Sequence, residues 1–329
     1  MKKRVYSGIR ATGRLHLGNY LGAVKGMLAL QDEYDCVFSV VDLHTITVPY
    51  QPDTLQVSVR NIILDYLAAG LDPEKCKLEI QSQVPQHTEL AYLLSTIYPV
   101  SRLEDLPTYK DKKAQYPKYV NMGLLYYPVL MAADVLLYKG ELVPVGIDQE
   151  PHLEVMREIA RKFNSMFGST FPEPQRFKTE GEYVPSLAGS GKMSKSIDGS
   201  FINLTDDLAT IKARLAAAPT DSGTLGGDPT SPRLRGTNVA NLFTLLRLFE
   251  SKEVYSKFIQ DCIDKKIRYS ELKDVLAIAI YKELKPFQDK REEFKNNPEL
   301  VDSIIKESNE KCLKMAEETI VEVRSKMGL

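Results

Sequence analysis

The order of hydrophobic and polar positions divides the first part of the chain into short strands and longer helices. Residues 4–9, 77–80 and 142–145 are predicted to be strands, and the nearly continuous apolar run at 36–41 is typical of a strand buried on both faces. Apolar residues at helical spacing predict helices at 21–30, 53–69, 88–97, 123–138 and 149–167. Strands that alternate with helices imply right-handed crossovers and a parallel sheet.

Three other segments have a different pattern. Residues 106–118 are rich in Pro, Lys and Tyr, which predicts an exposed, mobile connection, and residues 170–190 are rich in loop-forming residues. Beyond residue 203 the pattern is almost wholly helical, apart from a Gly- and Pro-rich interruption at 219–236. We therefore expect an α/β nucleotide-binding domain over residues 1–200 and an all-helical domain over residues 201–329.

Composition narrows the class of protein. The chain has 329 residues and a net charge of -1, so only local patches could attract a nucleic acid. The N-terminus turns polar before a signal-peptide core could form, and no apolar run reaches the roughly 18 residues of a membrane span. The four cysteines lie far apart and lack metal-ligand spacing. We expect a cytoplasmic protein with reduced thiols, no membrane segment and no protein-bound metal.

Two glycine-containing segments carry side chains that suit phosphate. Residues 191–196, Gly-Lys-Met-Ser-Lys-Ser, bring two ammonium groups and two hydroxyls together in a loop. His16, Gly18 and Asn19 follow the first strand, where backbone N–H groups and the positive end of a helix meet at the carboxyl edge of a sheet. Each segment alone fits a solvated loop or a structural histidine equally well, and only the pair indicates a nucleotide site.

The same two segments carry a family resemblance. Residues 12–19 resemble the HIGH signature of class I aminoacyl-tRNA synthetases, with Asn19 in place of the last histidine, and residues 192–196 match their KMSKS signature. Residues 127–136 and 143–149 closely resemble the bacterial type of tryptophanyl-tRNA synthetases. The resemblance covers most of the chain. It implies a Rossmann-like fold of the HUP type and a helical domain that binds the tRNA anticodon.

The choice of amino acid would depend on Asp134. It is the only charged residue between Met122 and Lys139, and it shares a helix face with Tyr127 and Met131. A carboxylate on an apolar face needs a partner. That partner is either internal, such as a lysine or a backbone cap, or the donor-only N–H group of a bound indole. In the second case the site would reject phenylalanine strongly.

The resemblance also assigns roles to individual residues. Tyr127 and Gln149 would meet the ammonium or carboxylate group, and Met131, Val143 and Val145 would wall the indole ring unless they are plain core. The residues that it places at tryptophan are Tyr6, Gly8, Tyr127, Met131, Asp134, Val143, Val145 and Gln149. Those that it places at ATP are Arg10, Ala11, Thr12, Gly18, Asn19, Lys113, Gly146, Ile147, Asp148, Val184, Lys192, Met193, Ser194, Lys195 and Ser196. The catalytic residues would be His16, Lys192 and Lys195. Many relatives have Gln, Pro and Glu at positions 10, 11 and 147, which leaves the side-chain roles of Arg10 and Ile147 open.

The implied function is activation of L-tryptophan by ATP and transfer of the aminoacyl group to the 3′ end of tRNA(Trp), by a homodimer. The tryptophan carboxylate needs no general base, so catalysis would rest on positioning and on the charges of Lys192, Lys195 and Mg²⁺. Some relatives carry an iron–sulfur site, which Cys262 and Cys312 cannot form. The alternatives are a tyrosyl-tRNA synthetase, a nucleotidylyltransferase, and a regulator that binds tryptophan or RNA without charging tRNA.

Overall fold

The chain folds into two compact units. The computed structural model describes residues 2–178, 183–189, 191–194, 197–220, 228–229, 231 and 237–329. Unit 1 consists of Met1–Gly13, Met27–Thr179 and Asn297–Leu329, and unit 2 consists of Arg14–Gly26 and Glu180–Asn296. The division differs from the expected single boundary at residue 200. His16, Gly18 and Asn19 of the first signature segment belong to unit 2, and the end of the chain belongs to unit 1.

Unit 1 is built on a parallel sheet, which confirms the predicted α/β fold class. In the described part of the chain the sheet has five strands in the order β3-β2-β1-β4-β5. Val5 of the central strand pairs with Cys36 on one side and with Leu142 on the other. The strand order reverses at this point, so the carboxyl ends of β1 and β4 flank the place where open α/β sheets bind ligands. The strands are Arg4–Ile9 (β1), Asp35–Val40 (β2), Lys77–Ile80 (β3), Leu142–Pro144 (β4) and Gln175–Phe177 (β5).

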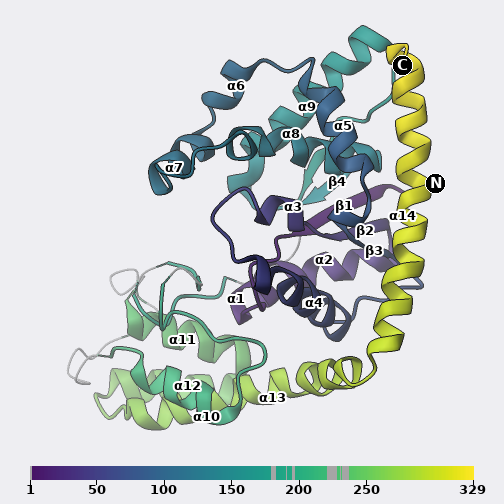
Figure 1. Ribbon diagram of the computed structural model, residues 1–329. Coiled ribbons are helices and arrows are strands. Elements are labelled where there is room, and N and C mark those ends of the chain that lie inside the picture. Colours follow the sequence, from purple (N-terminus) through teal and green to yellow (C-terminus); the bar gives the residue numbers. More distant parts are fainter. Residues whose placement is uncertain are drawn as a thin grey trace. The chain divides into compact units, whose positions relative to one another are not determined.

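Helices cover both faces of this sheet, with α8 and α9 on one side and α4 on the other (Figure 1). Helices of unit 1 are Asp42–Thr45 (α3), Pro52–Ala68 (α4), Gln86–Ser95 (α5), Val100–Glu104 (α6), Pro107–Gln115 (α7), Met122–Leu137 (α8), Glu150–Phe167 (α9) and Pro298–Met327 (α14).

Two segments of unit 1 differ from the sequence prediction. The connection predicted at 106–118 contains the helix α7, which starts with Pro107 at a position where no backbone N–H is needed. Tyr109 is the only buried residue in α7, so the helix has no apolar periodicity by which to recognise it. The strand β5 lies within the segment expected to be loop, and its three residues are too few to show an alternating pattern.

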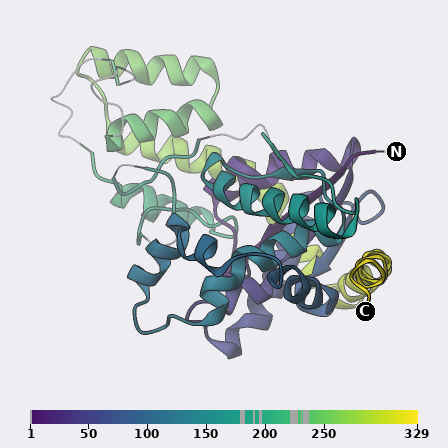
Figure 2. The same ribbon diagram turned by 90° about the horizontal axis from the view of Figure 1, so that it is seen from above.

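The long helix α14 covers the edge of the sheet at β3. The Ser308 hydroxyl accepts a hydrogen bond of 2.6 Å from the Leu78 backbone N–H, and the Asn309 side chain accepts one of 3.1 Å from Ile80. Edge strands otherwise expose unpaired backbone groups. Figure 2 views α14 nearly along its axis, beside the sheet. The C-terminal helix is therefore part of the α/β unit and not of a separate helical domain.

Unit 2 is mainly helical in its described part. Leu17–Asn19 (α1) continues through a π-helical turn at Tyr20–Val24 into Lys25–Ala29 (α2), which leads back to unit 1. The helices α10 and α11 both pack on α13. The later helices are Leu208–Ala217 (α10), Asn238–Phe249 (α11), Lys252–Ile263 (α12) and Tyr269–Lys295 (α13).

Three properties expected from composition can be compared with the structure. All four cysteines are buried and free. Among the residues described, no helix combines the length and the apolar character that a bilayer span requires. The same residues include no group of three or more His, Cys, Asp or Glu side chains placed to hold a metal ion.

Candidate active site

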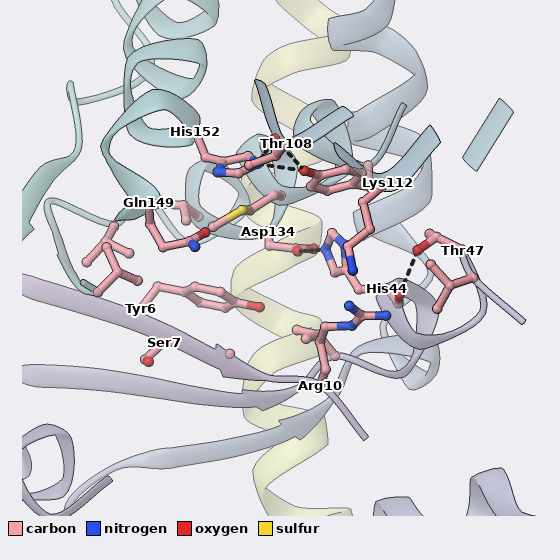
Figure 3. Close-up of a pocket in the computed structure, with 18 of the residues that line it drawn as sticks. Tyr6, Ser7, Arg10, His44, Thr47, Thr108, Lys112, Asp134, Gln149 and His152 are labelled. Carbon is pink, nitrogen blue, oxygen red and sulfur yellow. Dashed lines mark hydrogen bonds and ion pairs between the residues drawn. The ribbon is translucent and has the colours of Figure 1, made fainter. Parts of the chain in front are cut away.

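A cavity of about 400 Å³ opens at the carboxyl ends of β1 and β4 in unit 1 (Figure 3). The side chains around it come from both strands and from α3, α7, α8 and α9. All eight residues that the resemblance places at tryptophan line this one cavity, namely Tyr6, Gly8, Tyr127, Met131, Asp134, Val143, Val145 and Gln149. The cavity lies where the strand order reverses, as expected for a ligand site in this kind of sheet.

Asp134 is the charged group at the centre of the cavity wall. Its side chain is 2% exposed, and its carboxylate has three polar neighbours within the protein. Gln81 donates a hydrogen bond of 2.7 Å to Oδ1, His87 Nδ1 lies 2.7 Å from the same oxygen, and His44 Nε2 lies 2.7 Å from Oδ2. An ionised carboxylate has about four acceptor positions. Asp134 therefore has internal partners and still keeps one position on Oδ2.

The electrostatic surroundings keep Asp134 ionised. Burial alone would raise the pKa of its carboxyl group, but His44 and His87 hold that pKa well below its ordinary value. Burial would lower the pKa of His87, yet the carboxylates of Glu79 and Asp134 raise it to about 10. The cavity thus presents an acceptor-only carboxylate at neutral pH.

Tyr127, Thr108 and His152 form a second, neutral group of polar side chains in the cavity wall. The Tyr127 hydroxyl is 2.8 Å from His152 Nε2 and donates a hydrogen bond of 2.9 Å to Thr108. Burial lowers the pKa of His152 and raises that of Tyr127, so both are uncharged at neutral pH. His152 Nδ1 is buried without a hydrogen-bond partner among the described residues. These side chains connect α7, α8 and α9 around one end of the cavity.

Two cations, Arg10 and Lys112, reach into the cavity from opposite sides (Figure 3). The Nε atom of Arg10 is buried and has no hydrogen-bond partner in the described part of the chain. Burial lowers the pKa of Lys112, and the nearby charge of Arg10 lowers it further. A partly buried cation whose Nε has no hydrogen-bond partner favours an anionic ligand. Lys113, which the sequence analysis chose in this segment, is exposed and does not line the cavity; its neighbour Lys112 does.

The other ATP candidates of unit 1 follow β1 and β4. Arg10, Ala11 and Thr12 line a second cavity of about 310 Å³, so Arg10 borders both cavities. After β4, Gly146, Ile147 and Asp148 are exposed. The carboxylate of Asp148 accepts a hydrogen bond of 2.7 Å from Gln149.

The two signature segments meet within unit 2. The backbone N–H of Leu17 donates a hydrogen bond of 2.8 Å to the Ile202 carbonyl oxygen. His16 caps α1, with Nδ1 accepting a hydrogen bond of 3.3 Å from Asn19 N. A Cβ atom on Gly18 would lie 2.9 Å from the Cβ of Met193 and 3.0 Å from the His16 ring. Only glycine therefore lets the second signature segment pack this closely on the first.

The loop with the lysines combines buried and exposed positions. Val184 and Met193 are buried, and the Met193 N–H donates a hydrogen bond of 3.1 Å to the Val184 carbonyl oxygen. Lys192 is exposed, with its Nζ 5.9 Å from the centre of the Tyr183 ring. The Ser194 carbonyl oxygen accepts a hydrogen bond of 2.5 Å from Ser200. Lys195 and Ser196 lie outside the described residues.

Comparisons with known proteins agree on one family. Residues 1–285 match the family described as tRNA synthetases class I (W and Y). A tryptophan–tRNA ligase of Porphyromonas gingivalis is 40% identical over 98% of this chain and 98% of its own. The chain belongs to this synthetase family. The crystal structure of a tryptophanyl-tRNA synthetase from Campylobacter jejuni, complexed with ADP and tryptophan, has a TM-score of 0.88 at 31% identity and covers 99% of this chain and 100% of its own.

A more distant relative has the same fold but carries the name of a synthetase for a different amino acid. A tyrosyl-tRNA synthetase from Archaeoglobus fulgidus has a TM-score of 0.64 at 17% identity, covering 88% of this chain and 90% of its own, and this likeness shows the fold alone. The full-length relatives at about 40% identity are tryptophan–tRNA ligases. The chain is thus a member of the tryptophan branch of this synthetase family.

Sequence reasoning missed many of the polar side chains in and behind the wall of the synthetase cavity. His44, His87 and Gln81 around Asp134, Glu79 behind them, and Thr108 and His152 beside Tyr127 were not among the candidates. Lone histidines on helices carry no motif, and their partners come from distant parts of the chain. The one available signal was Asp134 itself, because a carboxylate on an apolar helix requires several donors nearby.

Proposed function

We propose that this member of the synthetase family is a tryptophan–tRNA ligase whose unit 1 cavity holds the amino acid. The observation that carries the proposal is the buried, ionised Asp134, which has one acceptor position left on Oδ2. That position suits the N–H of an indole, which is a donor only. Phenylalanine would leave the position unpaired, and a missing hydrogen bond of this kind can cost a factor of roughly 10⁴–10⁵ in discrimination.

Arg10 and Lys112 would bind the carboxylate end of tryptophan. Arg10, with its unpartnered Nε, and Lys112 would hold the tryptophan carboxylate and the phosphate that it attacks. Tyr127 and Gln149 would receive the ammonium group. The remaining tryptophan contacts would be Tyr6, Gly8, Met131, Val143 and Val145. In the ATP site we propose Ala11, Thr12, Gly18, Asn19, Gly146, Ile147, Asp148, Val184, Met193, Ser194 and Ser196.

The reaction would proceed by in-line displacement at the α-phosphorus of ATP. A carboxylate oxygen forms the new bond, the bond to the β-phosphate breaks, and pyrophosphate leaves with the electron pair. His16, Lys192 and Lys195 would stabilise the negative charge that shifts to pyrophosphate. A hydroxyl of the tRNA 3′ adenosine then attacks the activated carbonyl group and releases AMP. Bound Mg²⁺ supplies further positive charge at the phosphates. The described residues offer no cluster to hold it, which fits delivery as the complex with ATP.

The wider assignments extend the same proposal. Exposed Lys265, Lys266 and Arg268 lie between α12 and α13 of unit 2 and would contact tRNA(Trp). We also propose that the protein is a homodimer, as the family resemblance implies. The absence of a spanning helix among the described residues is compatible with a cytoplasmic location. Size-exclusion chromatography with light scattering tests the dimer.

Amino-acid-dependent exchange of pyrophosphate into ATP tests the enzymatic proposal. Exchange that requires tryptophan, and that tyrosine and phenylalanine support at least about 10³-fold less well, is the expected result. Tyrosine-dependent exchange would identify the tyrosine branch. Tryptophan binding without exchange would identify a regulator that does not charge tRNA.

A further inference from the structure

A row of fully buried charged side chains extends from Asp134 away from the cavity. Behind Asp134 lies His87 on α5, and behind His87 lies Glu79 on β3, both with no exposed surface. His87 Nε2 is 3.2 Å and 3.3 Å from the two oxygens of Glu79, and Nδ1 lies 2.7 Å from Asp134 Oδ1 as an ion-pair contact whose angle is outside that of a hydrogen bond. Glu79 also accepts hydrogen bonds from the hydroxyls of Tyr138 and Tyr6.

This arrangement requires a charged imidazolium ring. Each nitrogen of His87 faces a carboxylate, and a neutral ring could donate a proton to only one of them. The other titratable groups nearby are Tyr6 on β1, Tyr138 on α8 and Cys312 on α14. Burial raises the pKa of all three, so they stay neutral up to pH 9. The charges around His87 in this range are therefore those of the two carboxylates.

We propose that His87, which contacts Glu79 on its other side, is a positioning residue for recognition of the indole N–H group. His87 contacts Oδ1 of Asp134 on the side away from the cavity, and His44 occupies one hydrogen-bond acceptor position on Oδ2. The remaining acceptor position on Oδ2 is then available to the ligand. The inference rests on the proposed function, because it concerns the selectivity of the same cavity. His87 does not line the cavity, and it acts only through Asp134.

Two substitutions of His87 separate its two contacts. The side-chain amide of asparagine occupies the place of Nδ1, so His87→Asn keeps a donor toward Asp134. The longer His87→Gln places its amide near Nε2 and keeps a donor toward Glu79 instead. The surface substitution Glu89→Gln on the same helix, which removes an ion pair with Arg324, serves as the control.

The readout is the ratio of kcat/KM in pyrophosphate exchange for tryptophan and for its analogue with sulfur in place of the indole N–H. We expect His87→Gln to lower this ratio about tenfold or more, and His87→Asn and Glu89→Gln to stay within about threefold of the unmodified protein. Equal ratios in His87→Gln and the unmodified protein would overturn the inference. A purely structural role would reduce both substrates alike. No tryptophan-dependent exchange in the unmodified protein would instead refute the proposed function.

A measurement on the unmodified protein remains if the variants do not fold. Nitrogen NMR of histidine-labelled protein distinguishes an imidazolium from a neutral ring. We expect His87 to carry protons on both nitrogens from pH 6 to pH 9, and its Nδ1 signal to shift when tryptophan binds. A neutral ring at pH 7.5, or no shift on binding, would overturn the inference.

Discussion

The amino-acid cavity in unit 1 and the signature cluster in unit 2 use side chains in opposite ways. In the cavity, Asp134 is buried and fixed by three side chains from α3, α5 and the turn after β3. In the signature cluster, Lys192 is exposed, and its Nζ lies 5.9 Å from the centre of the Tyr183 ring. The close packing there is between Gly18 and the buried Met193.

The difference follows from what each region must recognise. An indole differs from a phenyl ring by one N–H group in a rigid frame, so its acceptor must be fixed before the ligand arrives. A phosphate group is highly charged and presents several oxygens, so a flexible lysine can find it from a well-packed backbone. Under the proposed function, selectivity would depend on the burial of Asp134, and phosphate binding on a packed backbone that carries the exposed Lys192.

Asp134→Asn should cause the largest loss of activity among the substitutions considered. The amide keeps the shape but cannot accept from all three donors and an indole, and it leaves His44 and His87 without their anion. We expect kcat/KM for tryptophan in pyrophosphate exchange to fall at least about 100-fold, with the KM for ATP unchanged. A thermal melt verifies that the variant is folded at the assay temperature. A folded variant with full preference for tryptophan over phenylalanine would contradict the role of Asp134.

Lys192→Ala should have the next largest effect. An exposed cation contributes little to folding, so the melting temperature should not change. We expect kcat of exchange to fall about 10²-fold, because the charge matters when pyrophosphate leaves. Binding of tryptophan alone, measured by the fluorescence of the ligand in a protein that has no tryptophan, should be unaffected. Lys195→Ala should behave alike. Normal exchange in both variants would remove the lysines from the mechanism.

The parts of the molecule that could be predicted from the sequence are those with a local signal. The strands β1 and β3 have the expected limits. The eight tryptophan candidates came from a resemblance, and they line one cavity. Physical reasoning alone supplied a reason for Asp134 as an acceptor and for Met131, Val143 and Val145 as apolar walls.

The parts that could not be predicted depend on contacts between distant residues. The sequence gives no indication that Ser308 and Asn309 of α14 bond to β3, some 230 residues earlier. It likewise does not show that His87 stands between Glu79 and Asp134, since a lone histidine on a helix is usually unremarkable. In α7 the sequence does not show which of the two neighbouring lysines lines the cavity, because Lys112 and Lys113 look alike until the phase of the helix is known.

Substitutions of Arg10 test whether a cation in the amino-acid cavity contributes to tryptophan binding. Arg10→Met removes the partly buried cation while keeping most of the apolar volume. We expect the KM for tryptophan in exchange to rise about 10- to 50-fold, since a charge-assisted hydrogen bond to the carboxylate is lost. Arg10→Gln should recover part of the affinity through its amide. The exposed Lys113→Met is the matched control and should change KM less than about twofold. Equal effects of all three variants would contradict a specific role for Arg10.

Gly18→Ala should give the smallest effect, and it probes packing in the signature cluster. The added methyl group would meet Met193 Cβ at 2.9 Å and the His16 ring at 3.0 Å, and overpacking of this kind costs about 1–3 kcal/mol. If the packing fixes the geometry of the ATP site, kcat of exchange should decrease even at assay temperatures well below the melting temperature. Tryptophan binding in unit 1 should stay intact. Gly70→Ala is the control, because a methyl group there meets no atom within 4 Å but strains a φ of +105°. A loss of melting temperature in both variants with normal exchange in both would show that Gly18 serves folding alone.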